Sequence, residues 1–187
     1  MDQGVADPGA GSTALLFQLL LMVILIIVNA FFAASEMALV SVDANRLKER
    51  RDEGDERARR ILRLLEDPSD FLSMIQICIT LAGFFNSASA ATGLATYVAD
   101  AFASFGVPSA LGVATVTITI LLSLLTIIFG ELVPKRLALQ SAEKFADSAV
   151  GVLWWASKLL NPFVHFLSWC TNSVLHLMGV EMDAIEE

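Results

Sequence analysis

A carboxylate, a glycine and a proline lie together where a long apolar stretch of the sequence ends. The segment reads Phe-Gly-Glu-Leu-Val-Pro-Lys over residues 129–135, and no charged residue precedes Glu131 between Ala110 and Gly130. An ionisable residue at the end of such a run is costly to bury and usually marks a function. Pro134 has no backbone N–H, so the Gly130 carbonyl, four residues earlier, is expected to lose its helical donor. The motif therefore offers a carboxylate and a bare carbonyl, which are hard oxygen ligands that suit Mg2+.

Two other apolar stretches add neutral polar groups to this pair. Ser35 lies in the first stretch and Asn86 in the second. An amide in hydrocarbon must find a partner, and Ser89, three residues on, shares its helical face. One carboxylate with several neutral oxygens predicts a cation site of modest affinity, which suits a transporter because the ion must also be released. Transporters often place such sites at a broken helix, and Pro134 is expected to break this one.

The acidic residues have alternative interpretations. Lys135 follows Glu131 by four residues, which is good helical spacing for an ion pair. Pro134 is expected to disrupt that register, and exposed pairs contribute little, so the ion pair alone is the less favoured interpretation. Glu36 is either a functional intramembrane acid or an ordinary acid at the membrane interface, and the sequence leaves both open.

The apolar stretches also define the fold class. Of the 187 residues 56% are hydrophobic, and the mean hydropathy is +0.66, whereas an ordinary soluble domain is about 45–50% apolar. A membrane span needs about 20 mostly apolar residues. We therefore predict an all-α integral membrane protein with three transmembrane helices, at about residues 15–42, 70–99 and 110–131.

The remaining segments are expected to be helical as well. Residues 43–67 mix basic and acidic side chains around a partial apolar stripe, and Gly54 divides them. This pattern predicts a cytosolic helical hairpin or a helix on the membrane surface. Residues 137–180 are predicted to form amphipathic juxtamembrane helices in the interface, where tryptophan is enriched. Because residues 159–180 carry no Lys, Arg, Asp or Glu, a fourth span stays open.

The basic residues predict the orientation. All 12 Lys and Arg fall within residues 46–63 and 135–158. Residues 1–14 contain none, so they do not resemble a signal peptide, and they are predicted to be an extracytoplasmic tail. The positive-inside rule places both basic regions and the C-terminus in the cytoplasm of a multi-pass plasma-membrane protein. The net charge of −8 argues against nucleic acid as a partner.

Three motifs, taken together, resemble the CNNM/CorC family. They are residues 29–41 with the Ser35–Glu36 pair, Gln-Ile-Cys-Ile-Thr-Leu-Ala-Gly over 76–83, and Gly-Glu-Leu-Val-Pro-Lys over 130–135. The resemblance covers residues 15–187 and is to the transmembrane module of the family, often called DUF21. It implies a homodimeric Mg2+ transporter or exporter with three transmembrane helices and juxtamembrane helices, for which Na+ is a candidate coupling ion.

The resemblance also implies ligands and partners. Mg2+ is expected to bind largely dehydrated within the membrane module. The ligands matched by motif are Ser35, Asn86, the Gly130 carbonyl and Glu131, with Ser41 and Ser89 as further candidates. Family members carry cytosolic CBS domains after this module, and none is expected within this chain. The expected partners are the lipid bilayer, a second copy of the chain, and CBS domains C-terminal to it.

Two other function classes compete with transport. Faces of small residues suit helix packing, so the main alternative is a non-transporting dimeric membrane scaffold or regulatory module. Its melting temperature would not respond to millimolar Mg2+. An intramembrane enzyme would need a nucleophile or a second titratable group near Glu131. The sequence shows no His-Glu metal motif, no Gly-x-Ser-x-Gly and no phosphate loop, so catalysis is not expected.

Overall fold

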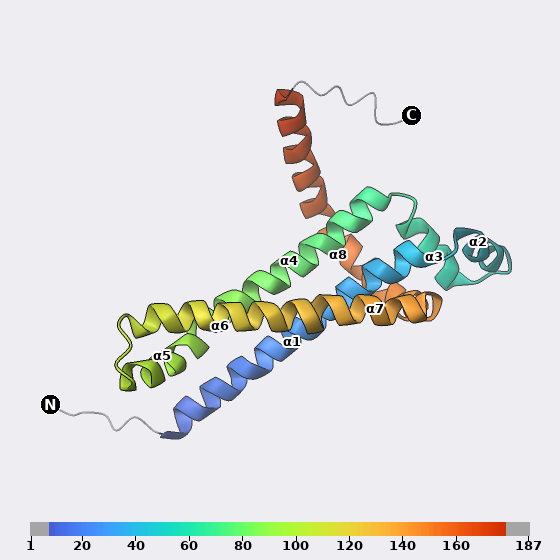
Figure 1. The fold of residues 1–187 in the computed structure, drawn as a ribbon. Helices are drawn as coiled ribbons and strands as arrows, with labels where there is room; N and C mark the ends of the chain where they lie inside the picture. The colour runs from blue at the N-terminus through green and yellow to red at the C-terminus, as the bar shows by residue number, and fades with distance from the viewer. Residues whose placement is uncertain (1–7, 179–187) are drawn as a thin grey trace.

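The computed structural model describes residues 8–178, and every regular element in that part of the chain is a helix (Figure 1). In chain order these are α1 (Pro8–Ser41), α2 (Ala44–Asp52), α3 (Glu56–Leu64), α4 (Pro68–Thr92), α5 (Leu94–Ser104), α6 (Ala110–Ile127), the π-helical turn η1 (Ile128–Leu132), α7 (Val133–Gln140) and α8 (Ala142–Leu177). Among the described residues, three helical segments are long and apolar enough to cross a membrane: Thr13–Ser41, Pro68–Ser104 and Ala110–Gln140. The prediction of an all-α membrane protein with three transmembrane helices is confirmed.

These segments form a bundle in which each helix has a polar contact with another. α4 packs against both α1 and α6, while η1 and α7 continue α6 along the later part of α1. Figure 1 shows α1 crossing behind α6 at an angle, with α5 at one end of α6 and α2, α3 and α7 toward the other. The outward side chains are large and apolar, for example Phe17, Phe84 and Val116. Such a surface suits hydrocarbon as the surrounding solvent, because all backbone polar groups of a helix are paired within it.

The second predicted span, residues 70–99, is not one continuous helix. α4 begins as the sequence indicates, with Asp67 as its N-cap and Pro68 in its first turn. The helix is interrupted at Gly93, which lies against the end of the Gln18 side chain of α1, so a larger residue there would require Gln18 to move. After this break α5 packs against α6 (Figure 1). The interruption therefore lies at a glycine, which weakens a helix interior, and at a contact with another helix that the local sequence does not show.

The third span does not end at Pro134, contrary to the expectation of a broken helix. α6 passes through η1 into α7 without a loop, and the Val133 N–H donates to the Ile128 carbonyl, five residues earlier. Such π-turns insert a residue into an α-helix and are frequent at functional sites. Pro134 then lies in the first turn of α7, where a missing N–H is tolerated. The π-turn thus accommodates the proline and keeps the helix continuous.

The charged segment forms a helical hairpin, α2 and α3. Each helix begins with an aspartate whose carboxylate accepts backbone N–H bonds, Asp43 for α2 and Asp55 for α3. Gly54 between them adopts a positive φ of 95°, which favours glycine. Of the two arrangements that the sequence leaves open for residues 43–67, the hairpin is the one observed. We call α2, α3, α7 and residues 142–158 of α8 the basic end of the bundle, because they carry the Lys and Arg residues.

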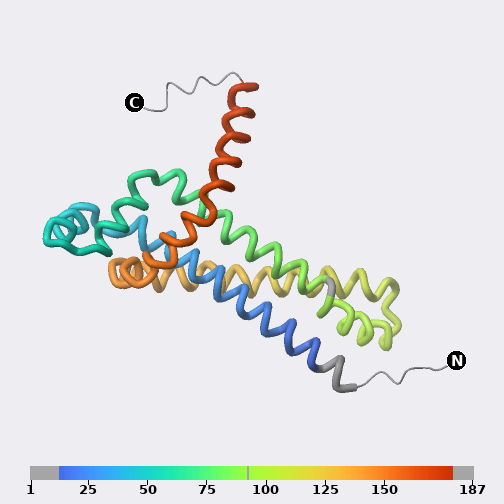
Figure 2. Tube along the Cα trace, turned by 180° about the vertical axis from the view of Figure 1, so that it is seen from behind, coloured from blue at the N-terminus to red at the C-terminus, as the bar shows by residue number. Residues whose placement is uncertain are grey.

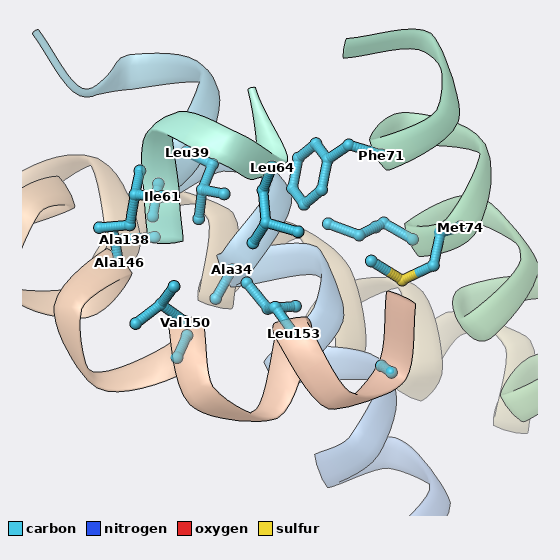
Figure 3. Packing of buried hydrophobic residues seen from close by; sticks show 14 of the residues in the cluster. Ala34, Leu39, Ile61, Leu64, Phe71, Met74, Ala138, Ala146, Val150 and Leu153 are labelled. Atoms are coloured by element: carbon cyan, nitrogen blue, oxygen red, sulfur yellow. The ribbon is translucent and has the colours of Figure 1, made fainter. Parts of the chain in front are cut away.

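The main hydrophobic core lies at this basic end. It joins apolar side chains from α1, α2, α3, α4, α7 and α8, including Leu39, Ile61, Met74 and Leu153. Figure 3 shows the side chains of α3, α4 and α8 pointing toward one another around α1. Small residues such as Ala34 let the helices approach closely. This core holds the later part of α1 in place, and the polar residues described below depend on that position.

α8 follows as a long helix that contains Pro162. Its first part packs against the core, and its later part turns away from the bundle (Figure 2). Within residues 8–178, α8 is not among the helices apolar enough to cross a membrane, so the structure gives no support for a fourth span there. The predicted tail falls on residues 1–7 in part, and the end of the predicted juxtamembrane segment falls on residues 179 and 180. These residues lie outside the described part of the chain.

An ionic network fixes the hairpin to α8. The Arg50 guanidinium donates to Asp55 at 2.6 and 3.0 Å and to both carboxylate oxygens of Asp147 at 2.9 and 3.0 Å. These side chains are about three-quarters buried, so water screens them only in part. The hydrogen bond from Arg50 lowers the pKa of Asp55, and the two carboxylates raise the pKa of Arg50. One guanidinium thereby ties α2, α3 and α8 together.

We expect acid to loosen this hairpin before it unfolds the bundle. Because the pKa of Asp55 is lowered from 3.8, its stabilising contribution is complete above that value and is lost as the pH falls through the lowered one. The protection factors of the α2–α3 amides, which compare exchange with the unfolded chain at the same pH, should therefore fall below about pH 4. Arg50→Gln should lower these protection factors already at neutral pH, because it removes about 1–2 kcal/mol of local stability. Arg51→Gln is the matched control, since Arg51 pairs only with its exposed neighbour Asp52 among the described ion pairs. Equal protection in both variants would contradict this role of Arg50.

Candidate cation site

Asn29 of α1 is buried against the π-turn of the third span. Only 3% of its surface is exposed, and its Nδ2 donates to the Gly130 carbonyl at 3.0 Å. A carbonyl can only accept, so the amide must present its nitrogen here and its Oδ1 must point elsewhere. Among the described residues, this Oδ1 is buried and has no hydrogen-bond partner. A buried orphaned acceptor of this kind costs about 1–3 kcal/mol.

Asn86 of α4 repeats this arrangement one helical turn away. It is 1% exposed, its Nδ2 lies 3.0 Å from the Thr126 hydroxyl of α6, and its Oδ1 has no hydrogen-bond partner within the described chain. Thr126 and Gly130 are four residues apart on one face of the α6–η1 helix, about 6 Å along its axis. The first and second spans therefore each place one buried amide against the same face of the third.

These contacts define a small polar centre inside an apolar bundle, which we call the neutral centre because none of its groups is charged. Its oxygen atoms are the orphaned Oδ1 atoms of Asn29 and Asn86, the Gly130 carbonyl, which retains a second lone pair, and the hydroxyl of Thr126. Neutral oxygens of this kind are ligands for a hard cation such as Mg2+. The described residues contain no group of three or more His, Cys, Asp or Glu able to hold a metal. A cation bound here would therefore meet mostly neutral oxygens, which suits binding that must be reversed.

Gly130 is the residue that lets Asn29 approach so closely. A Cβ atom built on Gly130 would lie 3.0 Å from Asn29 Nδ2 and 3.5 Å from the Thr126 methyl group. The first distance is tighter than an ordinary van der Waals contact, so the amide would have to move. The glycine of the Gly-Glu-Leu-Val-Pro-Lys motif is therefore needed for packing between α1 and η1 as well as for its carbonyl.

Substituting this glycine should lower stability where a matched substitution raises it. Gly130→Ala gains about 1 kcal/mol of helix propensity, but it displaces the Asn29 amide, and a buried donor left without its partner costs about 1–3 kcal/mol. We expect a lower melting temperature in detergent for Gly130→Ala. Gly112→Ala in α6 should raise it, because a Cβ there meets no atom within 4 Å. If both variants were stabilised, the close contact at Gly130 would not matter for folding.

Glu131 forms an ion pair with Lys135, although the sequence analysis did not favour this pair. Lys135 Nζ lies 3.1 Å from Glu131 Oε1, so Pro134 does not disrupt their register. The same Nζ lies 3.0 Å from Glu36 Oε2 of α1. Glu36 follows Asn29 by seven residues, so both lie on one face of α1. We call Glu36, Lys135 and Glu131 the charged triad, and it adjoins the neutral centre because Glu131 follows Gly130 directly.

The hydrogen bonds given for the three predicted serine ligands lie elsewhere. Ser35 is fully buried, but it lies about 120° around α1 from Asn29, and its hydroxyl donates to the Phe31 carbonyl at 2.7 Å. Ser41 is exposed at the end of α1, about 18 Å beyond Asn29 along the axis. Ser89 lies one turn beyond Asn86, where its carbonyl accepts from Gln18. Their role as ligands stays a prediction.

Sequence reasoning missed two residues of this site, Asn29 and Thr126, which appear in the sequence only as polar residues in apolar runs. For Lys135 the sequence indicated the pairing with Glu131 but not the second contact, with Glu36. A signal for Asn29 was present, because a second amide in a predicted span also needs a buried partner. The partner itself lies 101 residues away, and only the folded chain brings the two together.

A groove reaches the charged triad from the side of α8. It lies between α4 and the later part of α8, has a volume of about 850 Å3, and includes Glu36 in its wall. Hydroxyl and amide side chains make up much of its lining: Ser69, Ser73, Gln76, Thr80, Ser168, Thr171 and Asn172. Solvent can therefore approach Glu36 along a partly polar path.

The fold and the site together define a class of protein: a helical, multi-pass membrane protein with an oxygen-rich polar centre between its spans. The sequence profile of the cyclin M transmembrane N-terminal domain matches residues 20–187. The chain belongs to this family, as the CNNM/CorC resemblance implies. Family membership points to a role in membrane transport rather than catalysis.

Relatives in several bacteria share this domain. The chain is 32% identical over 90% of its length to a UPF0053 protein of Synechocystis, and 31% identical over 87% to an uncharacterized protein of Mycobacterium tuberculosis. It is also 28% identical over 87% of its length to a Haemophilus influenzae protein named polyamine export protein. It spans only 38%, 46% and 38% of the lengths of these three relatives, respectively.

Proposed function

We propose that the chain is the membrane module of a divalent-cation transporter and that its cargo is Mg2+. The observation that carries this proposal is the pair of buried Oδ1 atoms on Asn29 and Asn86, which the protein itself leaves without partners. A folded chain tolerates such a cost when the groups serve a ligand. In this proposal a bound cation supplies the missing interaction at these atoms.

The proposed ligands combine this neutral centre with the adjacent carboxylate. Asn29, Asn86 and the Gly130 carbonyl provide neutral oxygens, and Glu131 provides the negative charge after its ion pair opens. Ser35 remains a further candidate from the family motif. Mg2+ demands short distances and a near-octahedral set of oxygens, so such a set would require the ion to lose much of its water. The hard oxygen ligands support Mg2+ as cargo, with Na+ as a candidate coupling ion.

Orientation and assembly belong to the same proposal. The basic end carries the Lys and Arg residues, which supports its placement in the cytoplasm. The groove beside Glu36 would then open toward the cytoplasmic interface, where ions are loaded or released. The exposed apolar faces of α4 and α6 leave room for a second copy of the chain as well as for lipid.

Ion flux in proteoliposomes tests the proposal. Purified chain in vesicles loaded with a Mg2+-sensitive dye should give a Mg2+ flux that empty vesicles lack, and an imposed Na+ gradient should change its rate if Na+ is coupled. Melting in detergent should shift upward with Mg2+ concentration, because a bound ligand stabilises the fold. A melting temperature insensitive to millimolar Mg2+, together with no flux, would favour the scaffold alternative.

An organic polycation is the second candidate cargo. The Haemophilus relative is named a polyamine export protein, and the groove of about 850 Å3 beside Glu36 is far larger than one ion needs. Adding spermidine to the melting experiment separates the two. A shift with spermidine but not with Mg2+ would assign the groove to an extended cation, whereas Mg2+ alone should act if the buried centre is the site.

A further inference from the structure

The position of Lys135 is the feature that the proposed function does not yet explain. Its Nζ lies 3.0 Å from Glu36 on α1 and 3.1 Å from Glu131 on η1, so one ammonium bridges carboxylates from two spans. Beside a cation site, this arrangement puts a positive charge of the protein where a positive ion has to approach. Both carboxylates are neutralised in part before any ion arrives.

We propose that the Lys135 ammonium is a tethered substitute for the cargo, which neutralises Glu36 and Glu131 while the site is unloaded and leaves them when a divalent cation binds. This inference rests on the proposed function, since it assigns a role at the same site. Two carboxylates without a cation would repel each other strongly inside the bundle. The ammonium removes that repulsion without retaining the cargo.

The chemistry of the side chain favours exchange over a permanent clamp. Lysine carries a compact charge on a flexible stem, whereas arginine binds carboxylates with a rigid fork. Elsewhere in this chain the fixed clamp is Arg50, which donates to both oxygens of Asp147. Lys135 instead makes one short contact to each partner, and the Glu131 side chain is 40% exposed. The triad can therefore open without breaking a bidentate pair.

The surroundings leave space for this movement. Glu36 lies in the wall of the groove between α4 and α8, so the face of the triad at Glu36 borders an open, partly polar space. After displacement the ammonium can be solvated there, and it can return as the cation leaves. Lys135 is thus a positioning residue that sets how tightly the ion is held and how readily it is released.

The test compares Mg2+ binding and flux in the purified parent, Lys135→Gln and Arg136→Gln. Lys135→Gln removes the competing charge but keeps a hydrogen-bonding side chain, so it should bind Mg2+ at least about tenfold more tightly while its maximal flux falls. Arg136→Gln makes the same charge change at the next residue, which has no ion pair among those described, and should bind like the parent. A purely structural ion pair would instead predict lower stability and no gain in affinity.

Each outcome is decisive. If the parent binds Mg2+ and Lys135→Gln binds it equally or more weakly, the inference is overturned while the proposed function stands. If the parent does not bind Mg2+, the proposed function fails and the inference fails with it. Should Lys135→Gln not fold, Lys135→Arg replaces it: the guanidinium should hold both carboxylates more firmly and weaken Mg2+ binding about tenfold or more. Parent-like affinity in Lys135→Arg would overturn the inference.

Discussion

Glu131→Gln should weaken Mg2+ binding by about 100-fold, the largest loss that we expect from a single change in the charged triad. Even residues that only orient a metal ligand contribute about 10–100-fold to affinity, so a direct carboxylate ligand should reach at least the upper end of that range. The substitution also leaves Lys135 with Glu36 as its remaining partner in the triad. Isothermal titration of Mg2+ into the purified protein, together with the Mg2+-dependent melting shift, measures the effect.

Two companion variants separate ligation from general charge. Glu143→Gln changes the net charge equally at the basic end, where Glu143 pairs with Arg46, and should leave Mg2+ binding unchanged. Glu131→Asp retains the charge but shortens the reach, which the strict geometry of Mg2+ should not tolerate. If Glu131→Gln bound Mg2+ like the parent, Glu131 would be only the ion-pair partner of Lys135. If Glu131→Asp bound normally, its charge and not its position would matter.

The helical architecture could be predicted because its determinants are local. The Asp67–Pro68 pair begins α4, and Gly54 separates α2 from α3, as their conformational preferences require. The apolar runs are long enough to define three spans without any knowledge of their neighbours. The Glu131–Lys135 spacing also pointed to an ion pair, but Pro134 was given too much weight, since a π-turn accommodates it.

The site itself could be predicted only in part, because its contacts join distant segments. Gly130 and Glu131 stand out from one motif, whereas the contact of Asn29 with Gly130 depends on how α1 crosses η1. The contact of Gly93 with Gln18 likewise joins residues from two different helices. Periodicity placed Ser89 on the face of Asn86, yet a shared face does not show which residue meets Thr126. Packing between helices determines which of these residues meet, and the sequence alone does not show that packing.

Asn86→Leu should abolish the Mg2+-dependent melting shift without destabilising the Mg2+-free protein. Leucine has the same side-chain branching as asparagine, and it removes an acceptor that is buried without a partner. The loss of the bond to Thr126 is small, because that hydroxyl can turn back to a carbonyl of its own helix. We therefore expect the Mg2+-free melting temperature to stay within about 4 °C of the parent or to rise, while Mg2+ flux in proteoliposomes falls at least about tenfold.

If Asn86→Leu keeps its stability but loses Mg2+ binding, Asn86 is a ligand and not a structural contact. Gln18→Leu is the control, because it also replaces a bundle amide by an apolar residue, but at the Ser89 carbonyl away from the neutral centre. It should retain the Mg2+ shift. A structural role for Asn86 predicts the reverse pattern: Asn86→Leu would melt many degrees lower and would still respond to Mg2+. That result would remove the orphaned Oδ1 atoms as the basis for transport, since a group that serves folding needs no ligand to explain its burial.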